Sequence, residues 1–319
     1  MPSRTPRVTR EYKNHHLDST RWDVYQPRAG DIIVATSYKS GTTWAQQIVS
    51  WLLRGEAAMA FELREISPWV DACFMGISKT ELRDLVAALP DRRFLKSHLP
   101  LDGLPYYPEV HYLLVGRDPR DVFMSLHNHY WNYTDGIYGI LNDSERLVGE
   151  PLPVCPEDPR ALWRDWVGRG YFEWESEGYP FWANMGHTQS FWEYRELPNF
   201  LFLHYNDMLA DLEGAVRKIV AFAGIAASEE RILRTVAETT FARVKERAEA
   251  LSEDQDASRI AFRGGAGAFF YKGVNGRWRD VLTDEDLALY EAAKARALSP
   301  DCAAWLERGG PLAARASAV

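Results

Sequence analysis

The sequence predicts an α/β fold with a mainly parallel central sheet covered by helices on both faces, as a single three-layer domain. Four short runs of aliphatic and aromatic residues have the length of buried strands. Stretches with helical spacing lie between them, and such alternation is typical of parallel sheets. A loop of small residues joins the first run to a helix, which is the unit that opens many nucleotide-binding sheets.

The first expected strand is Asp31–Thr36, a β-branched run. The loop Ser37–Thr43 follows it, and helical spacing then runs from Trp44 to Arg54 and stops at Gly55. The second expected strand is Arg93–Ser97. This half of the pattern therefore predicts one complete strand-loop-helix unit and the strand that follows it.

The third expected strand is Val110–Val115. Pro119 suits the first position of a helix and Asp118 suits its cap, so we expect a helix from Pro119 to about Tyr130. The fourth strand is Phe200–His204, and the amphipathic stretch Leu212–Phe222 ends at a nearby glycine. Strands and helices thus alternate to the end of the sheet.

No linker or internal repeat divides the chain, so residues 1–319 are expected to form one domain. Residues 1–30 are expected to form a polar N-terminal arm. Residues 132–197 are rich in aromatic, proline and glycine residues, and an insertion of that length favours a function such as acceptor binding. Residues 251–280 are expected to be mobile without ligand, and residues 310–319 to be frayed.

Composition excludes several classes of protein. The formal net charge of −8 argues against nucleic-acid binding, which favours a basic surface. The cysteines Cys73, Cys155 and Cys302 are scattered, so neither a disulfide framework nor a zinc cluster is expected. No signal-peptide pattern and no run of about 20 apolar residues is seen. We therefore expect a cytoplasmic protein without a membrane span.

The loop Ser37–Thr43 has the chemistry of a phosphate-binding loop. Gly41 allows the backbone to turn close to an anion, and the amides at the start of the next helix point toward it. Lys39 adds a positive charge, and Thr42 and Thr43 add hydroxyl donors. The spacing is not that of a Walker A loop. An ordinary strand-to-helix turn with a solvated lysine is the alternative interpretation.

Further candidates lie where the second and third strands end. Lys96 and His98 are two residues apart, so they project from the same face of a strand. Histidine titrates in the range that suits a general base. Arg117 follows the third strand, and its planar fork suits a phosphate. Ser125 lies on the next helix and offers a hydroxyl to the same group.

Four segments, in order along the chain, resemble motifs of the cytosolic sulfotransferase family. From the first to the last they span most of the chain, and together they are far more specific than any one alone. They are Ser37–Trp44, which resembles the P-K-S-G-T-T-W loop for the 5'-phosphosulfate; Lys96–Pro100, which resembles the catalytic K-[ST]-H-L-P segment; Gly116–Asp121 with Ser125, which resembles the 3'-phosphate segment; and Phe270–Gly273 with Gly276–Trp278, which resembles the closing loop R-K-G-x-x-G-x-W.

The resemblance implies the family's P-loop-like fold and in-line transfer of a sulfuryl group from 3'-phosphoadenosine-5'-phosphosulfate (PAPS) to a hydroxyl. It implies His98 as general base and Lys39 and Lys96 as the cations that stabilise the developing charge, with no metal. Residues 251–280 would close over the donor. The implied donor-binding residues are Lys39, Ser40, Gly41, Thr42, Thr43, Trp44, Arg117, Ser125, Tyr205, Thr239, Phe241, Lys272 and Gly273.

The sequence departs from the family pattern at three places. Tyr38 replaces the proline of the phosphate loop, and Tyr271 replaces an arginine that contacts the 3'-phosphate. Arg263 and Arg277 are candidates to replace that arginine. The family's dimerisation stretch is poorly matched by Arg279–Asp286, so the sequence leaves the oligomeric state open.

The acceptor remains the least defined part. A phenol, a sterol-like alcohol or a hydroxylated lipid would suit an apolar pocket, and an amine acceptor is not excluded. A small-molecule kinase and a nucleotide-binding module without catalysis are the alternative functions. The aromatic residues that would line the acceptor pocket, or else form the local core of the insertion, are Tyr130, Trp131, Tyr133, Phe172, Trp174, Phe181 and Trp182.

Overall fold

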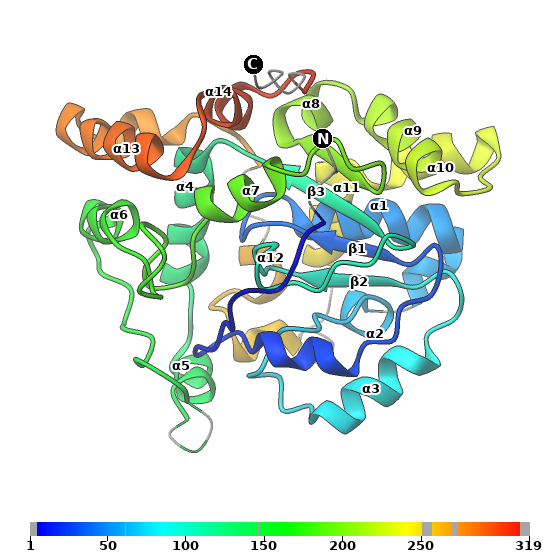
Figure 1. The fold of residues 1–319 in the computed structure, drawn as a ribbon, viewed down its shortest axis with the longest axis horizontal. Coiled ribbons are helices and arrows are strands. Elements are labelled where there is room, and N and C mark those ends of the chain that lie inside the picture. The colour runs from blue at the N-terminus through cyan, green and yellow to red at the C-terminus, as the bar shows by residue number, and fades with distance from the viewer. Residues whose placement is uncertain are drawn as a thin grey trace.

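A computed structural model describes residues 5–60, 62–143, 145, 147–250, 257–269 and 273–312. Within these residues, parallel strands form one sheet in the order β2-β1-β3-β4 (Figure 1). Every strand end lies within one residue of its predicted position, which confirms the predicted sheet. The strands are β1 (Ile32–Ala35), β2 (Phe94–Ser97), β3 (His111–Gly116) and β4 (Phe200–His204).

The helices of the described residues fall between and after these strands. The α-helices are α1 (Thr42–Arg54), α2 (Leu63–Ile66), α3 (Lys79–Ala88), α4 (Pro119–Trp131), α5 (Asp135–Leu141), α6 (Pro159–Gly168), α7 (Met185–Trp192), α8 (Tyr205–Ala210), α9 (Leu212–Ala223), α10 (Glu229–Glu238), α11 (Phe241–Glu249), α12 (Gly265–Phe269), α13 (Asp284–Ala297) and α14 (Pro300–Arg308). Short 3-10 helices are η1 (Ser19–Val24), η2 (Gly55–Ala60), η3 (Ala257–Ile260) and η4 (Arg277–Asp280).

Alternate residues of β1 belong to different apolar cores, because successive strand side chains point to opposite faces of a sheet. Ile32 and Val34 pack in the core that contains residues of α1, α9 and α10. Ile33 and Ala35 pack in the core that contains residues of α4, α6, α7, α13 and α14. The sheet therefore lies between two helical layers, as Figure 1 shows, and the predicted three-layer architecture is confirmed.

Two helix starts place functional residues at the carboxyl edge of the sheet. Gly41 caps α1 with φ 121°, a backbone conformation that favours glycine. Asp118 caps α4, because its side chain accepts a hydrogen bond from the backbone N–H of Arg120, and Pro119 is the first helical residue. Helix α4 starts at the predicted residue, and α1 starts two residues before the predicted Trp44, so the loops after β1 and β3 end at well-defined helices.

The N-terminal segment packs into the molecule rather than extending as an arm. Tyr12, Leu17 and Trp22 are buried in the same core as β1 and β3. His15 and His16 are buried as well, although the sequence marks this segment only by its polarity. Residues from 12 to 25 are therefore structural, and they bring titratable groups close to the carboxyl edge of the sheet.

The insertion between β3 and β4 folds into helices that are anchored to the C-terminal helix pair. Nε1 of Trp163 in α6 donates to the backbone oxygen of Asp286 in α13 at 2.9 Å. Nε of Arg160 also lies 2.5 Å from the buried carboxylate of Asp286.

None of the described helices is both long enough and apolar enough to cross a bilayer.

Candidate active site

Most of the predicted site residues gather around one cavity of about 280 Å³. The cavity lies at the carboxyl ends of the parallel strands, which is where open α/β sheets bind their ligands. The predicted residues that line it are Lys39, Gly41, Thr42, Thr43, Trp44, Lys96, His98, Arg117, Ser125, Tyr205 and Phe241.

The loop after β1 wraps one side of this cavity. Lys39 has φ 63°, and it is the one non-glycine residue in the left-handed region among those described. Its carbonyl oxygen accepts a hydrogen bond from Nη1 of Arg117 at 3.2 Å. This bond ties the loop to the end of β3, and the N-terminus of α1 points its free amides toward the same space.

His98 is held so that one ring nitrogen remains available to the cavity. Its Nδ1 lies 2.7 Å from the carbonyl oxygen of Thr36, which can only accept, so Nδ1 carries the proton. The side chain is 1% exposed. Burial, reinforced by the charge of Lys96, lowers the pKa of His98 well below its usual value. The imidazole is therefore neutral near pH 7, and Nε2 keeps its lone pair.

The buried carboxylate of Asp71 holds the backbone of His98 in place. Oδ2 of Asp71 accepts the backbone N–H of His98 at 3.1 Å and Nε1 of Trp69 at 2.8 Å. Its Oδ1 accepts Nε1 of Trp22 at 3.1 Å. Asp71 was not predicted from the sequence, since a single aspartate in a loop carries no pattern that marks it as buried.

Three cations share the cavity with little compensating charge. Burial, with the nearby charges of Arg117 and Lys96, lowers the pKa of Lys39 to about 7. Burial likewise lowers the pKa of Lys96 to about 8, although Asp71 opposes this shift. Nζ of Lys96 also lies 4.0 Å from the ring centroid of Trp69. Such depressed pKa values mean that the cavity fits an anion, which would restore the charge on both lysines.

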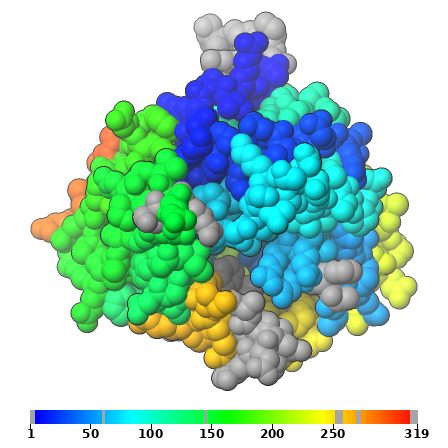
Figure 2. All heavy atoms as spheres, turned by 90° about the horizontal axis from the view of Figure 1, so that it is seen from below, coloured from blue at the N-terminus to red at the C-terminus, as the bar shows by residue number. Residues whose placement is uncertain are grey.

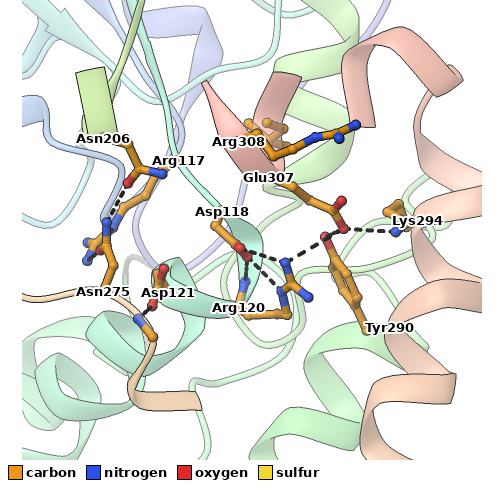
Figure 3. Close-up of polar contacts among 12 residues, drawn as sticks. Arg117, Asp118, Arg120, Asp121, Asn206, Asn275, Tyr290, Lys294, Glu307 and Arg308 are labelled. Atoms are coloured by element: carbon orange, nitrogen blue, oxygen red, sulfur yellow. Dashed lines mark hydrogen bonds and ion pairs between the residues drawn. The ribbon is translucent and has the colours of Figure 1, made fainter. Parts of the chain in front are cut away.

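The loop at residues 273–276 is fastened beside Arg117 (Figure 3). Nη2 of Arg117 donates to Oδ1 of Asn275 at 2.7 Å, and Nδ2 of Asn275 donates to Oδ1 of Asn206 at 2.5 Å. The backbone N–H of Gly276 donates to Oδ1 of Asp121 at 2.6 Å. The guanidinium of Arg117 also lies 4.2 Å from the centroid of the Tyr205 ring. Asn275 is thus a site residue that the sequence motifs did not reveal.

Arg120 points away from Arg117 in Figure 3 and forms a separate ion-pair cluster. Its Nη2 lies 2.7 Å from Oδ2 of Asp118 and 3.8 Å from the carboxylate of Glu307. The carboxylate of Glu307 also accepts from Tyr290 at 3.0 Å and from Lys294 at 2.8 Å. This cluster joins α4 to α13 and α14, so it serves the fold.

Of the two arginines considered as replacements for the family arginine at Tyr271, Arg277 lies nearer the cavity. Its charge lowers the pKa of Arg117, whereas the charge of Arg263 acts on Tyr138 in α5. Arg263 is exposed and does not line the cavity. Tyr271, Phe270 and the predicted donor residue Lys272 lie outside the described residues.

Aromatic residues form the wall beyond Arg117. The rings of Trp44 and Tyr205 are 5.4 Å apart, and Nε1 of Trp44 donates to the carbonyl oxygen of Thr239 at 2.6 Å. Phe241 lies against Gly273, where a Cβ atom would be 2.6 Å from the Phe241 ring. Glycine at position 273 therefore allows this close approach, which a side chain would prevent.

Two predicted donor residues do not line the cavity with their side chains. The hydroxyl of Ser40 is buried and lies 2.6 Å from the hydroxyl of Ser37. The hydroxyl of Thr239 donates to the carbonyl oxygen of Thr235 at 2.8 Å. Thr239 instead contributes its own carbonyl oxygen to Trp44. Both side chains stabilise the walls of the site.

The remaining walls come from segments that are far apart in the sequence. Figure 2 shows three of these segments meeting on one face, the cyan stretch before β2, the green stretch around α5 and the orange stretch 257–269. The lining residues from these and neighbouring segments are His16, Tyr38, Trp69, Phe74, His129, Tyr133, Ile137, Val244, Ala261 and Phe262.

Only Tyr133 of the aromatic residues predicted from the insertion lines this cavity. Phe181 and Trp182 are buried behind Tyr38, with ring centroids 5.6 and 5.0 Å from its ring. Trp131 is 42% exposed. The alternative interpretation, a local core for the insertion, is therefore the better description of most of this group.

Among the described residues, no cluster of three or more His, Cys, Asp or Glu could hold a metal ion.

Comparison with known proteins places this geometry in context. A family model described as a sulfotransferase domain matches residues 29–299. A glycolipid sulfotransferase of Mycobacterium bovis is 31% identical over 314 residues, which is 93% of this chain and 94% of the relative. A retinol dehydratase structure with retinol and PAP has TM-score 0.67 and 26% identity, covering 88% of this chain and 84% of that chain. A mouse sulfotransferase structure with PAP has TM-score 0.65 and 19% identity, covering 90% and 92%.

Proposed function

The chain belongs to the sulfotransferase family, and from that premise we propose that it transfers the sulfuryl group of PAPS to an acceptor hydroxyl, with His98 as general base. The observation that carries this proposal is the hydrogen bond from Nδ1 of His98 to the carbonyl oxygen of Thr36, at 2.7 Å. It leaves a basic Nε2 in a cavity that is also lined by Lys39 and Lys96.

His98 is suited to accept the hydroxyl proton as the acceptor oxygen attacks. Its neutral state near pH 7 keeps the lone pair of Nε2 available, and the Thr36 carbonyl stabilises the imidazolium that forms by accepting the bond from Nδ1–H. Asp71 fixes the backbone of His98 through its amide, and the bond from Nδ1 to the Thr36 carbonyl fixes the orientation of the ring. General-base catalysis of this kind contributes about 10²- to 10⁴-fold.

Lys39 and Lys96 supply the positive charge that stabilises the transition state. When bound, PAPS supplies an activated sulfuryl group, and negative charge gathers on its bridging oxygen as the bond breaks. Both lysines line the cavity, and the negative charge of the donor would raise their pKa values and keep them protonated. Removing one such preorganised contact typically costs about 3 kcal/mol in the transition state.

The donor's nucleotide portion would lie between Arg117 and the aromatic wall. The fork of Arg117, with the hydroxyl of Ser125 on α4, is the expected 3'-phosphate site. Trp44, Tyr205 and Phe241 offer faces for the adenine. The solved relatives contain PAP, which fits this division of the cavity.

The acceptor is proposed to be a small molecule with an apolar body and at least one hydroxyl. Trp69, Phe74 and Phe262 give the cavity an aromatic wall next to His98, whose ring centroid is 4.9 Å from that of Trp69. A hydroxylated lipid is favoured over a phenol or a sterol-like alcohol, because relatives with 31% identity are named glycolipid sulfotransferases. The cytoplasmic location expected from the sequence belongs to the same proposal.

Calorimetric titration with PAP, without metal and with ATP as the control nucleotide, tests the donor site first. We expect tight binding of PAP and weak binding of ATP. Incubation with PAPS and a panel of hydroxylated lipids, phenols and sterols then tests transfer. Equal affinity for ATP, or turnover that requires Mg²⁺ and ATP, would instead support a kinase. PAP binding without any transfer would support a nucleotide-binding module.

A further inference from the structure

A chain of buried polar side chains leads away from Lys39. Nζ of Lys39 lies 3.4 Å from Nδ1 of His129 in α4. Nε2 of His129 lies 3.2 Å from the hydroxyl of Tyr133, and that hydroxyl lies 3.4 Å from Nε2 of His16. His16, His129 and Tyr133 all line the cavity, yet none of them belongs to the segments that resemble the family motifs.

The far end of this chain fixes the direction of its bonds. Nε2 of His15 lies 2.9 Å from the carbonyl oxygen of Pro180, which can only accept, so this nitrogen carries a proton. Burial lowers the pKa of His15 to about 4, so the ring is neutral and its Nδ1 is an acceptor. Nδ1 of His16 lies 2.5 Å from that atom and must therefore be the donor.

The directions of the next hydrogen bonds follow from His16 toward the cavity. Burial lowers the pKa of His16 well below its usual value, so its Nε2 is a bare acceptor and takes the proton of the Tyr133 hydroxyl. The oxygen of Tyr133 is then an acceptor toward His129, whose Nε2 must be the donor. His129 is neutral for the same reason of burial. Its Nδ1, which faces Lys39, is therefore the acceptor of the ring.

We propose that His15, His16, Tyr133 and His129, here called the histidine chain, hold Nδ1 of His129 as the hydrogen-bond acceptor of the Lys39 ammonium. The histidine chain thereby positions a charged Lys39 for the donor's 5'-phosphate. The inference rests on the proposed function, since it assumes that Lys39 binds the donor. These four residues are positioning residues, because they act through Lys39.

The surroundings of Lys39 show why such an acceptor matters. Arg117 after β3 and Lys96 in β2 are the charged groups that act on Lys39, and both disfavour its protonated form. His129 in turn faces Lys96, His98 and His16, which are all cationic or neutral. Nδ1 of His129 is thus an acceptor that opposes this repulsion without adding a negative charge that would repel the donor.

The hydroxyl of Tyr38 also contacts the histidine chain. Its hydroxyl is hydrogen-bonded to Nε2 of His129, the atom that the histidine chain makes a donor. Its ring is stacked on Phe181 at 5.6 Å, which fixes the position of the hydroxyl. The tyrosine that replaces the family's loop proline therefore gives Nε2–H of His129 a second acceptor.

The test is the pH dependence of PAP affinity, measured by calorimetry between pH 6 and 9 on wild type and on the double variant Tyr38→Phe with Tyr133→Phe. The double variant removes both hydroxyls that contact Nε2 of His129, which allows the ring to turn its N–H toward Lys39 and lowers the pKa of that lysine. We expect the loss of affinity on raising the pH to begin about one pH unit lower, so that affinity falls about tenfold relative to wild type at pH 8 or above. At pH 6 the affinities should be nearly equal.

His127→Phe is the matched control, because this partly buried histidine lies on the same helix but does not line the cavity. Its profile should follow that of wild type. Each of the two Phe replacements removes one oxygen atom, so the double variant should fold. A profile of the double variant identical to wild type, or an equal shift in His127→Phe, would overturn the inference. Failure of the wild type to bind PAP would instead overturn the proposed function.

Discussion

The two sides of the cavity are built in different ways. The side proposed to bind the donor, called the donor side, takes Lys39, Thr43, Lys96 and Arg117 from short segments directly after β1 and β3 or within β2. The side proposed to bind the acceptor, called the acceptor side, takes Phe74 and Phe262 from segments separated by scores of residues. Parallel strands bring their carboxyl ends together whatever the loops contain, so the donor side follows from the sheet. The acceptor side depends on how each connection packs.

This difference has a functional consequence. Donor binding should depend on a few charged groups and should be sensitive to their loss and to pH. Acceptor binding should be spread over many apolar contacts, each of modest value. The following predictions test that contrast, from the largest expected effect to the smallest.

Replacement of His98 by alanine should lower kcat by about 10²- to 10⁴-fold, because it removes the group that accepts the hydroxyl proton. The PAP dissociation constant should change little. Steady-state kinetics with a sulfated product assay and calorimetry with PAP measure the two quantities. His98→Asn, which retains a donor toward the Thr36 carbonyl but no basic nitrogen, should be equally inactive. Loss of PAP binding in both variants would contradict the role given to His98.

Replacement of Arg117 by alanine should weaken PAP binding by about 10- to 100-fold, since a hydrogen bond to a charged group is worth about 1.5–3 kcal/mol. The effect should appear mainly in donor affinity, measured by calorimetry. The control is Arg83→Ala, which removes an exposed arginine of α3 far from the cavity residues. Unchanged affinity in Arg117→Ala would place the 3'-phosphate elsewhere on the chain.

Stability and donor affinity should respond to pH with opposite signs. Lys39 and Lys96 have pKa values of about 7 and 8 in the empty cavity, against 10.5 in the unfolded chain. Between these values the unfolded state binds more protons, so the free energy of unfolding should rise with pH, by about 2–4 kcal/mol from pH 7 to 9 for the two lysines together. PAP affinity should fall over the same range, because the ligand needs charged lysines.

Denaturant unfolding at pH 7 and pH 9 measures the first effect, and calorimetry measures the second. The double variant Lys39→Met with Lys96→Met should lack the rise in the free energy of unfolding that wild type shows between pH 7 and pH 9. A rise of the same size in this double variant would assign the pH dependence of stability to other groups.

Shortening the acceptor wall should have the smallest effect. Phe74→Leu removes part of the aromatic surface next to Trp69, whose ring lies 5.6 Å from that of Phe74. We expect kcat/KM for an apolar acceptor to fall about tenfold or less, with PAP affinity unchanged. Phe222→Leu, on α9 beside His111, is the matched control. A change in PAP affinity for Phe74→Leu alone would mean that this residue serves the donor side.

The sequence by itself determined the sheet, the helix start at Pro119, and most of the residues that meet in the cavity at the carboxyl edge of the sheet. These features depend on local patterns: β-branched runs, capping residues, and short motifs whose residues act within one loop. The placement of Lys96 and His98 on one face follows from the two-residue period of a strand. Because these features depend on residues that are close together in the sequence, they can be predicted without knowledge of the fold.

Only the tertiary structure decided the rest. Asp71 under His98, Asn275 on Arg117 and the histidine chain behind Lys39 each join segments that no local pattern connects. Phe181 and Trp182 became core because Tyr38 and the N-terminal segment cover them, whereas Phe74 and Phe262 reached the cavity. Whether an aromatic side chain forms core or cavity wall depends on which distant segment packs against it, and the sequence of one segment does not contain that information.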